Sequence, residues 1–143
     1  MPSATVVAEA DVRVDDLFGG CRAKDFAAIA HLCTEVAVAP GRVLLREGQP
    51  GRQFLVVTAG RAKVEIGGTL LGWIDAGSFA GEMALLDSTS CVATVTAETP
   101  MHLWVFNTRE FQALLDLNLP KVSHRMALTI GRRLRVADRR LAA

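Results

Sequence analysis

Short runs of valine, leucine and isoleucine alternate with glycines through the middle of the chain. The glycines fall at 41, 48, 51, 60, 67, 68, 72, 77 and 81. This spacing is typical of many short strands joined by tight turns, as in a sandwich or a roll. Gly67 and Gly68 separate the runs 63–66 and 69–71, so we predict a two-residue hairpin turn with positive φ angles there. Two further strands are predicted over 92–97 and 101–106, with Pro100 in the turn between them.

Towards both ends of the chain the apolar period changes to three or four residues. Phe26, Ile29 and Cys33 predict a short helix over 24–32. Thr108 is predicted to cap a helix that ends at Leu117, and Pro120 to lie in the first turn of a longer helix over 119–140. One apolar stripe follows that longer helix, through Val122, Met126, Ile130, Leu134, Ala137 and Leu141.

These elements predict one domain with three parts. Residues 1–16 form a loosely ordered segment, residues 17–107 an N-terminal helix and a β-roll, and residues 108–143 a hinge and a long helix of the same domain. The predicted fold class is therefore mainly β with flanking helices. It is a β-roll (a double-stranded β-helix, jelly-roll-like) with one N-terminal helix and two C-terminal helices.

Composition narrows the function classes. The 143 residues are half hydrophobic, and the net charge of +1 gives no general reason to bind nucleic acid or an anionic membrane. We expect no membrane contact, because no apolar run has membrane-spanning length and no signal peptide opens the chain. Cys21, Cys33 and Cys91 are odd in number and far apart, which argues against a disulfide framework or a zinc site and favours the cytoplasm.

The strongest candidate for chemistry is the segment Gly81-Glu82-Met83-Ala84-Leu85-Leu86, with a strand beginning about nine residues later. Glycine lets the backbone approach a ligand, and the first amides of a helix attract anions. Glu82 is suited to accept hydrogen bonds from sugar hydroxyls. The alternative is a plain turn followed by an acid favoured at a helix start. No Ser-His-Asp arrangement, P-loop or metal cluster is present, so we expect no enzyme, no metal and no required cofactor.

Longer motifs carry a resemblance to a known family. The chain is similar, over about residues 17–141, to the cyclic nucleotide-binding domain of the catabolite activator and protein kinase A regulatory-subunit superfamily. The matching runs include Pro40-Gly41-x-Val43-Leu44-x-x-Glu47-Gly48, Gly77-x-Phe79-x-Gly81-Glu82-x-Ala84-Leu85-Leu86 and Ala93-Thr94-Val95.

The resemblance implies a β-roll that binds cAMP or cGMP. Glu82 would hold the ribose 2′-hydroxyl, and the amides of Met83 and Ala84 would face the cyclic phosphate. Val64, Leu71 and Ile74 would line the base side. Gly81, Ser90, Cys91 and Val92 complete the predicted ligand-binding set.

The chain differs from the family at the position that contacts the ligand's phosphate. Where the family has a proline followed by an arginine, this chain has Ser90-Cys91, and a thiol cannot form a bidentate, charge-assisted pair. We therefore expect binding weaker by about tenfold to a few hundredfold. Two functions follow. One is a regulatory module that relays cyclic-nucleotide binding to its C-terminal helix. The other is a degenerate domain that acts as a dimerisation or interaction scaffold, or that senses a different small ligand.

The long C-terminal helix is strongly basic opposite its apolar stripe. We expect this basic face to be solvated or to contact another chain, and a homodimer to form through the exposed C-terminal half of the stripe. Activator relatives read DNA with a separate helix-turn-helix domain, so no direct DNA binding by this chain is predicted. The basic residues are Lys121, Arg125, Arg132, Arg133, Arg135, Arg139 and Arg140.

Overall fold

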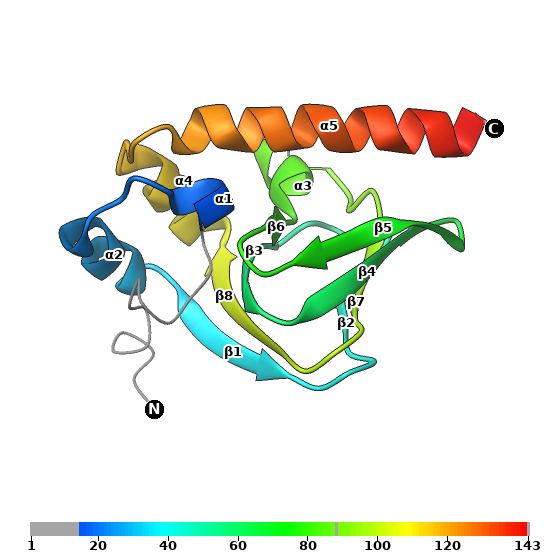
Figure 1. Cartoon of the computed structure of the whole chain (residues 1–143), viewed down its shortest axis with the longest axis horizontal. Helices are drawn as coiled ribbons and strands as arrows, with labels where there is room; N and C mark the ends of the chain where they lie inside the picture. The colour runs from blue at the N-terminus through cyan, green and yellow to red at the C-terminus, as the bar shows by residue number, and fades with distance from the viewer. Residues whose placement is uncertain (1–14, 88, 143) are drawn as a thin grey trace.

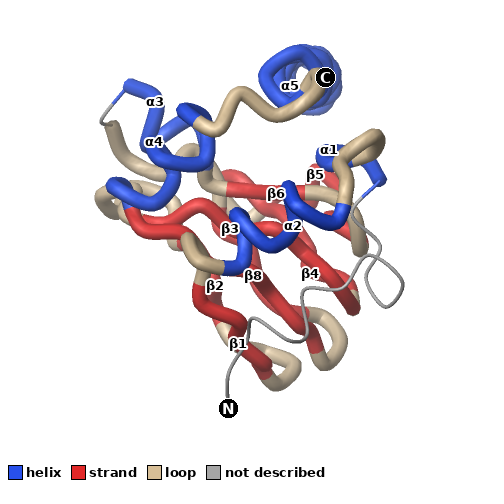
Figure 2. The backbone as a smooth tube through the Cα atoms, turned by 90° about the vertical axis from the view of Figure 1, so that its left-hand side faces the viewer, coloured by secondary structure: helices blue, strands red, loops and turns tan. Residues whose placement is uncertain are grey.

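Two four-stranded antiparallel sheets form a roll that carries helices along one side (Figures 1 and 2). The structure is a computed structural model that describes residues 15–87 and 89–142. The first sheet has the order β1 (Thr34–Val38), β8 (Met101–Asn107), β3 (Gln53–Ala59), β6 (Phe79–Ala80). The second has the order β2 (Val43–Leu45), β7 (Thr94–Ala97), β4 (Arg61–Ile66), β5 (Thr69–Asp75). The helices are α1 (Asp15–Phe18), α2 (Ala23–Ala30), α3 (Glu82–Asp87), α4 (Thr108–Asp116) and α5 (Val122–Ala142). The predicted fold class is confirmed.

The hairpin between β4 and β5 forms as the glycine pair predicts. Gly67 and Gly68 have φ angles of 56° and 80°, and Ile66 pairs with Thr69 across the turn. Both turn residues therefore use a backbone region that side chains with a Cβ rarely adopt.

Strand β3 is buried on both faces because it separates two hydrophobic cores. Phe54 and Val56 pack into a core beneath the helices, while Leu55 and Val57 pack into the interior of the roll. Successive side chains of a strand point to opposite faces, so one strand serves both cores. The helix-side core also contains Trp104, which is fully buried.

Two predicted helix boundaries are wrong. Asn107, not Thr108, caps α4: its side-chain oxygen accepts from the backbone N–H of Glu110, whose carboxylate accepts in return from the N–H of Asn107. Pro120 precedes α5 instead of lying in its first turn, because Asn118 and Lys121 have φ angles of 52° and 55°. A right-handed helix cannot include such residues, so α5 begins only at Val122.

Helix α5 lies across the roll, above α3 and β5 (Figure 1). Val122 and Met126 are buried against the helix-side core, and Ile130 is partly buried there. Farther along, Leu134 is 49% exposed. The side chains of Ala137 and Leu141 lie outside the described residues, as does the segment 1–14. No helix within the described ranges is long and apolar enough to cross a membrane.

Candidate ligand-binding site

A cavity of about 450 Å³ lies between the second sheet, α3 and α5. Its walls are mostly apolar side chains from β4, β5 and the segment before β7, and α5 closes one side. The described residues that line it are Leu45, Val64, Ile66, Leu71, Gly72, Trp73, Ile74, Ala80, Gly81, Glu82, Ala84, Cys91, Val92, Ala93, Val95, Arg132, Arg133 and Leu134.

Two glycines fix the helix that carries the candidate acid. Gly81 has a φ angle of 92°, and a Cβ there would collide with the carbonyl oxygen of Gln53 on β3. Gly51 packs directly against Ala84, so that a Cβ at position 51 would overlap the Cβ of Ala84. The backbone of α3 therefore sits close to the first sheet, and Glu82 is its first residue.

Glu82 is a buried carboxylate at the edge of the cavity. Its side chain is only 5% exposed, and its Oε1 has no hydrogen-bond partner among the described residues. Nη1 of Arg133 lies 3.6 Å from this oxygen, which is an ion pair but exceeds hydrogen-bond distance. Burial raises the pKa of Glu82, and the charge of Arg133 offsets part of that rise. Glu82 is thus an under-satisfied acceptor within the wall.

Arg133 reaches from α5 into the same wall. Its Nη2 donates to the hydroxyl of Ser78 at 2.8 Å and to the carbonyl oxygen of Phe79. Its guanidinium also stacks over the Phe79 ring, 4.6 Å from the centroid. Burial lowers the pKa of Arg133, and Glu82 opposes that shift. The prediction that the basic face is solvated or contacts another chain is therefore wrong at Arg133, which bonds within its own chain.

A second arginine of the predicted basic face also points inward. Arg125 donates to the carbonyl oxygen of Gly19, which lies beside α1. Arg132 and Arg135, in contrast, are exposed. The described basic residues of α5 therefore include both anchors on the rest of the domain and exposed surface charges.

Cys91 occupies the wall without supplying charge. The residue is 9% exposed, its N–H donates to the carbonyl oxygen of Gln49, and its own carbonyl oxygen accepts from the N–H of Gly48. Burial raises the pKa of the thiol, so at neutral pH this side chain is uncharged.

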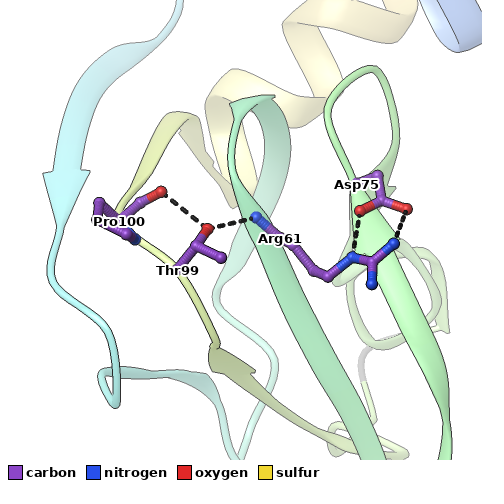
Figure 3. A network of polar contacts seen from close by, with 4 residues as sticks. All are labelled: Arg61, Asp75, Thr99 and Pro100. Carbon is purple, nitrogen blue, oxygen red and sulfur yellow. Dashed lines mark hydrogen bonds and ion pairs between the residues drawn. The ribbon is translucent and has the colours of Figure 1, made fainter.

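Arg61 is the centre of a network of polar contacts with Asp75 and Thr99 (Figure 3). Its Nε donates to Asp75 at 2.7 Å, and its guanidinium stacks over Trp73, 5.1 Å from the ring centroid. Its backbone N–H donates to the hydroxyl of Thr99, which in turn donates to the carbonyl oxygen of Pro100. These contacts tie the wall residue Trp73 to the turn before β8.

Most of the predicted site residues lie around this one cavity. Val64, Leu71, Ile74, Gly81, Glu82, Ala84, Cys91 and Val92 line it. Ser90 does not: it is exposed, and its backbone forms an isolated bridge with Pro50. The side chain of Met83 lies outside the described residues.

Sequence reasoning missed several wall residues that simple periodicity could have found. Ile66 follows Val64 by two residues on β4. Such spacing places side chains on one face of a strand. Arg133 follows Met126 and Ile130 by seven and three residues, which is the spacing of one helix face. Its position on the apolar stripe, inside a run of arginines, was the overlooked signal.

Known proteins share the sequence pattern and the fold of this chain. The model of the cyclic nucleotide-binding domain matches residues 35–118, which is more than half of the chain. The chain belongs to the cyclic nucleotide-binding domain family. The match covers the roll and α4 and ends before α5.

Individual relatives extend the similarity. Acetyltransferase Pat of Mycolicibacterium smegmatis is 32% identical over an alignment that covers all of this chain and 41% of Pat. The chain therefore spans less than half the length of that relative. The structure of Thermus thermophilus catabolite activator protein superposes with a TM-score of 0.73 at 26% identity, covering 89% of this chain and 62% of that one. The structure of Sp-2Cl-cAMPS bound to PKAR CBD2 superposes with a TM-score of 0.76 at 18% identity, covering 94% of this chain and 93% of that one, and supports the fold alone.

Proposed function

We propose that this chain is a regulatory module that binds a cyclic nucleotide in the cavity and conveys its occupancy to α5. The observation that carries the proposal is Glu82: a buried carboxylate whose Oε1 has no hydrogen-bond partner among the described residues, at the edge of an apolar cavity of about 450 Å³. A buried acceptor without a hydrogen bond costs free energy, and a ligand that donates to it recovers that cost. Small-ligand pockets combine such a group with apolar walls.

We assign each part of the nucleotide to a different group of cavity residues. The ribose hydroxyl donates to Glu82, and the backbone amides at 83 and 84 face the phosphate. Val64, Leu71 and Ile74 offer apolar surface to the base. Either cAMP or cGMP fits this division, so both are probes.

The proposed relay uses α5 as part of the wall. Arg133 and Leu134 line the cavity, so a bound ligand changes the contacts that hold the helix. The connection from α4 contains Asn118 and Lys121 at positive φ, a backbone region that asparagine tolerates but that costs a residue such as lysine about 1–2 kcal/mol. A ligand shifts the two-state equilibrium of such an element by its difference in affinity for the two positions.

The test is a calorimetric titration of the chain with cAMP and with cGMP. Binding should be measurable in the parent and lost in Glu82→Gln, because an amide is a poorer acceptor than a carboxylate. Glu98→Gln is the matched control, since Glu98 is exposed and lies outside the cavity wall. Equal affinities of parent and Glu82→Gln would refute the assigned role.

We further propose a regulatory and not a catalytic role, in the cytoplasm. The ionisable residues among the described wall residues are Glu82, Cys91, Arg132 and Arg133. The raised thiol pKa of Cys91 disfavours a nucleophilic thiolate. The three cysteines are free thiols, which suits a reducing compartment.

The second candidate function is a scaffold, or a sensor of another small ligand. The neutral Cys91 favours it, because a wall with less positive charge suits a less anionic ligand. The partly exposed Leu134 and Leu128 on α5 favour a homodimer through that helix. If neither cyclic nucleotide produces heat with the parent or with Cys91→Arg, the scaffold or alternative-ligand function replaces the first.

A further inference from the structure

We propose that Arg133 of α5 supplies the positive charge that binds the ligand's phosphate, in the role that position 91 cannot fill in this chain. This inference rests on the proposed cyclic-nucleotide binding. It makes Arg133 a specificity-determining residue for an anionic ligand and places that residue on the helix proposed to respond.

The positions of charge in the wall motivate the assignment. Arg132 and Arg133 are the cationic residues among the described lining residues, and Arg132 is exposed. Arg133 is instead held at the wall by Ser78 and Phe79. Position 91 carries a thiol that burial keeps uncharged. Phosphate recognition in this cavity therefore has one pre-positioned cation.

The hydrogen bonds of Arg133 leave part of its guanidinium available. Nη2 makes the bonds to Ser78 and Phe79, whereas Nη1 faces Glu82 at 3.6 Å without a hydrogen bond. Oε1 of Glu82 likewise has no hydrogen bond among the described residues. Oε1 of Glu82, an acceptor, and Nη1 of Arg133, a donor, thus lie side by side at the cavity wall without a hydrogen bond between them.

A ligand with a hydroxyl group near an anion satisfies both groups by an exchange of partners. The hydroxyl donates to Glu82, and the phosphate oxygens accept from Nη1 of Arg133. Both new contacts are charge-assisted hydrogen bonds, which are stronger than an ion pair that lacks one. A guanidinium can also hold phosphate through two parallel bonds. The bonds to Ser78 and Phe79 can stay in place, so the side chain needs little movement.

The experiment is a calorimetric double-mutant cycle on the full chain with cAMP, using Cys91→Arg, Arg133→Met and the two combined. Arg133→Met keeps an unbranched side chain and removes the charge. Arg135→Met is the matched control, because Arg135 is exposed on the same helix and does not line the cavity. Arg133→Lys keeps the charge and guards against a failure of Arg133→Met to fold.

Arg133→Met should weaken cAMP binding at least tenfold, whereas Arg135→Met should leave it within threefold and Arg133→Lys should retain more affinity than Arg133→Met. Cys91→Arg should improve the affinity of the Arg133→Met protein at least tenfold more than it improves the parent, because a second cation then replaces a missing one.

Three results would overturn the inference. If the parent binds and Arg133→Met binds equally or more tightly, Arg133 does not contact the phosphate, while the proposed function stands. If Arg133→Met weakens binding but Cys91→Arg improves both backgrounds equally, Arg133 acts only by holding α5. If neither the parent nor Cys91→Arg binds cAMP at millimolar concentration, the inference and the proposed function both fail.

Discussion

Replacing the buried thiol with a guanidinium, by Cys91→Arg, is the perturbation that addresses the phosphate contact most simply. Cys91 lines the cavity and is uncharged at neutral pH, so the substitution adds one cation to the wall. Cys91 borders a cavity of about 450 Å³, into which the longer side chain can extend. Because the neighbouring backbone bonds to Gly48 and Gln49 do not involve the side chain, the local chain path should persist.

The expected magnitude follows from the bonds gained and the freedom lost. A charge-assisted hydrogen bond contributes about 1.5–3 kcal/mol, and an arginine can form two with a phosphate. Ordering one long side chain costs about 0.5–1.5 kcal/mol. The net gain is at least about 1.5 kcal/mol, which corresponds to cAMP binding tighter by at least about tenfold.

Isothermal titration calorimetry of parent and variant gives this ratio directly. Ser90→Arg is the control, because Ser90 is exposed, adjacent in sequence and outside the cavity wall. It adds the same charge without the contact, and screening by salt should hold its effect below about threefold. Equal gains from the two substitutions, or no gain from Cys91→Arg, would refute the assignment of position 91 to the phosphate side of the cavity.

Three further predictions concern α3, Glu82 and α5. Gly51→Ala should lower the free energy of unfolding, measured by urea denaturation, by about 1–3 kcal/mol, because the new Cβ overlaps Ala84. Adding Ala84→Gly should restore stability, and an unchanged stability of Gly51→Ala would contradict the predicted overlap. Burial raises the pKa of Glu82 in the folded state. The resulting contribution of protonated Glu82 to folding stability is therefore complete below the ordinary carboxyl pKa, and it is lost as the pH rises through the pKa of the folded state. The melting temperature of the parent relative to Glu82→Gln should therefore fall from about pH 4 to pH 7, and a relative rise would argue against burial as the dominant cause. Leu134, which is 49% exposed, should lie in a dimer interface on α5. That dimer should become more stable as salt is added, because salt screens the repulsion between exposed arginines. Sedimentation that shows a monomer at all concentrations, unchanged by Leu134→Glu, would exclude this dimer.

Much of the roll was predictable because glycines mark its turns in the sequence. Gly67 and Gly68 adopt the positive φ angles that a two-residue hairpin requires, and the neighbouring runs form β4 and β5. The cap of α4 was misplaced by one residue because asparagine and threonine are both good caps. The reciprocal pair of Asn107 and Glu110 decides it, and that spacing was visible in the sequence.

The start of α5 was less accessible from the sequence. Asparagine tolerates a positive φ angle, but nothing in the sequence marks Lys121 for the same conformation. Tertiary packing of Val122 and Met126 against the helix-side core accompanies this turn, and a local pattern does not record such packing. The predicted first-turn role of Pro120 failed for that reason.

The candidate site divides in the same way. The segment at Gly81 and Glu82 was identified from its motif, because the chemistry is local to one turn and one helix start. Arg133 was assigned to a basic face that is solvated or contacts another chain, since arginine is rarely buried unless it is paired. Its partners Ser78, Phe79 and Glu82 lie about 50 residues away in the sequence, and the fold brings them together.

Occupation of the cavity beside α5 by a cyclic nucleotide can be tested with the two tryptophans of the chain. Trp73 lines the cavity, whereas Trp104 is fully buried in the helix-side core on the other face of the first sheet. Their indole N–H signals should be followed by two-dimensional NMR during titration with cAMP. Binding in the cavity should produce a saturable shift of the Trp73 signal and leave the Trp104 signal nearly unchanged. A Trp73 signal that stays fixed up to millimolar cAMP would mean that no cyclic nucleotide occupies this cavity.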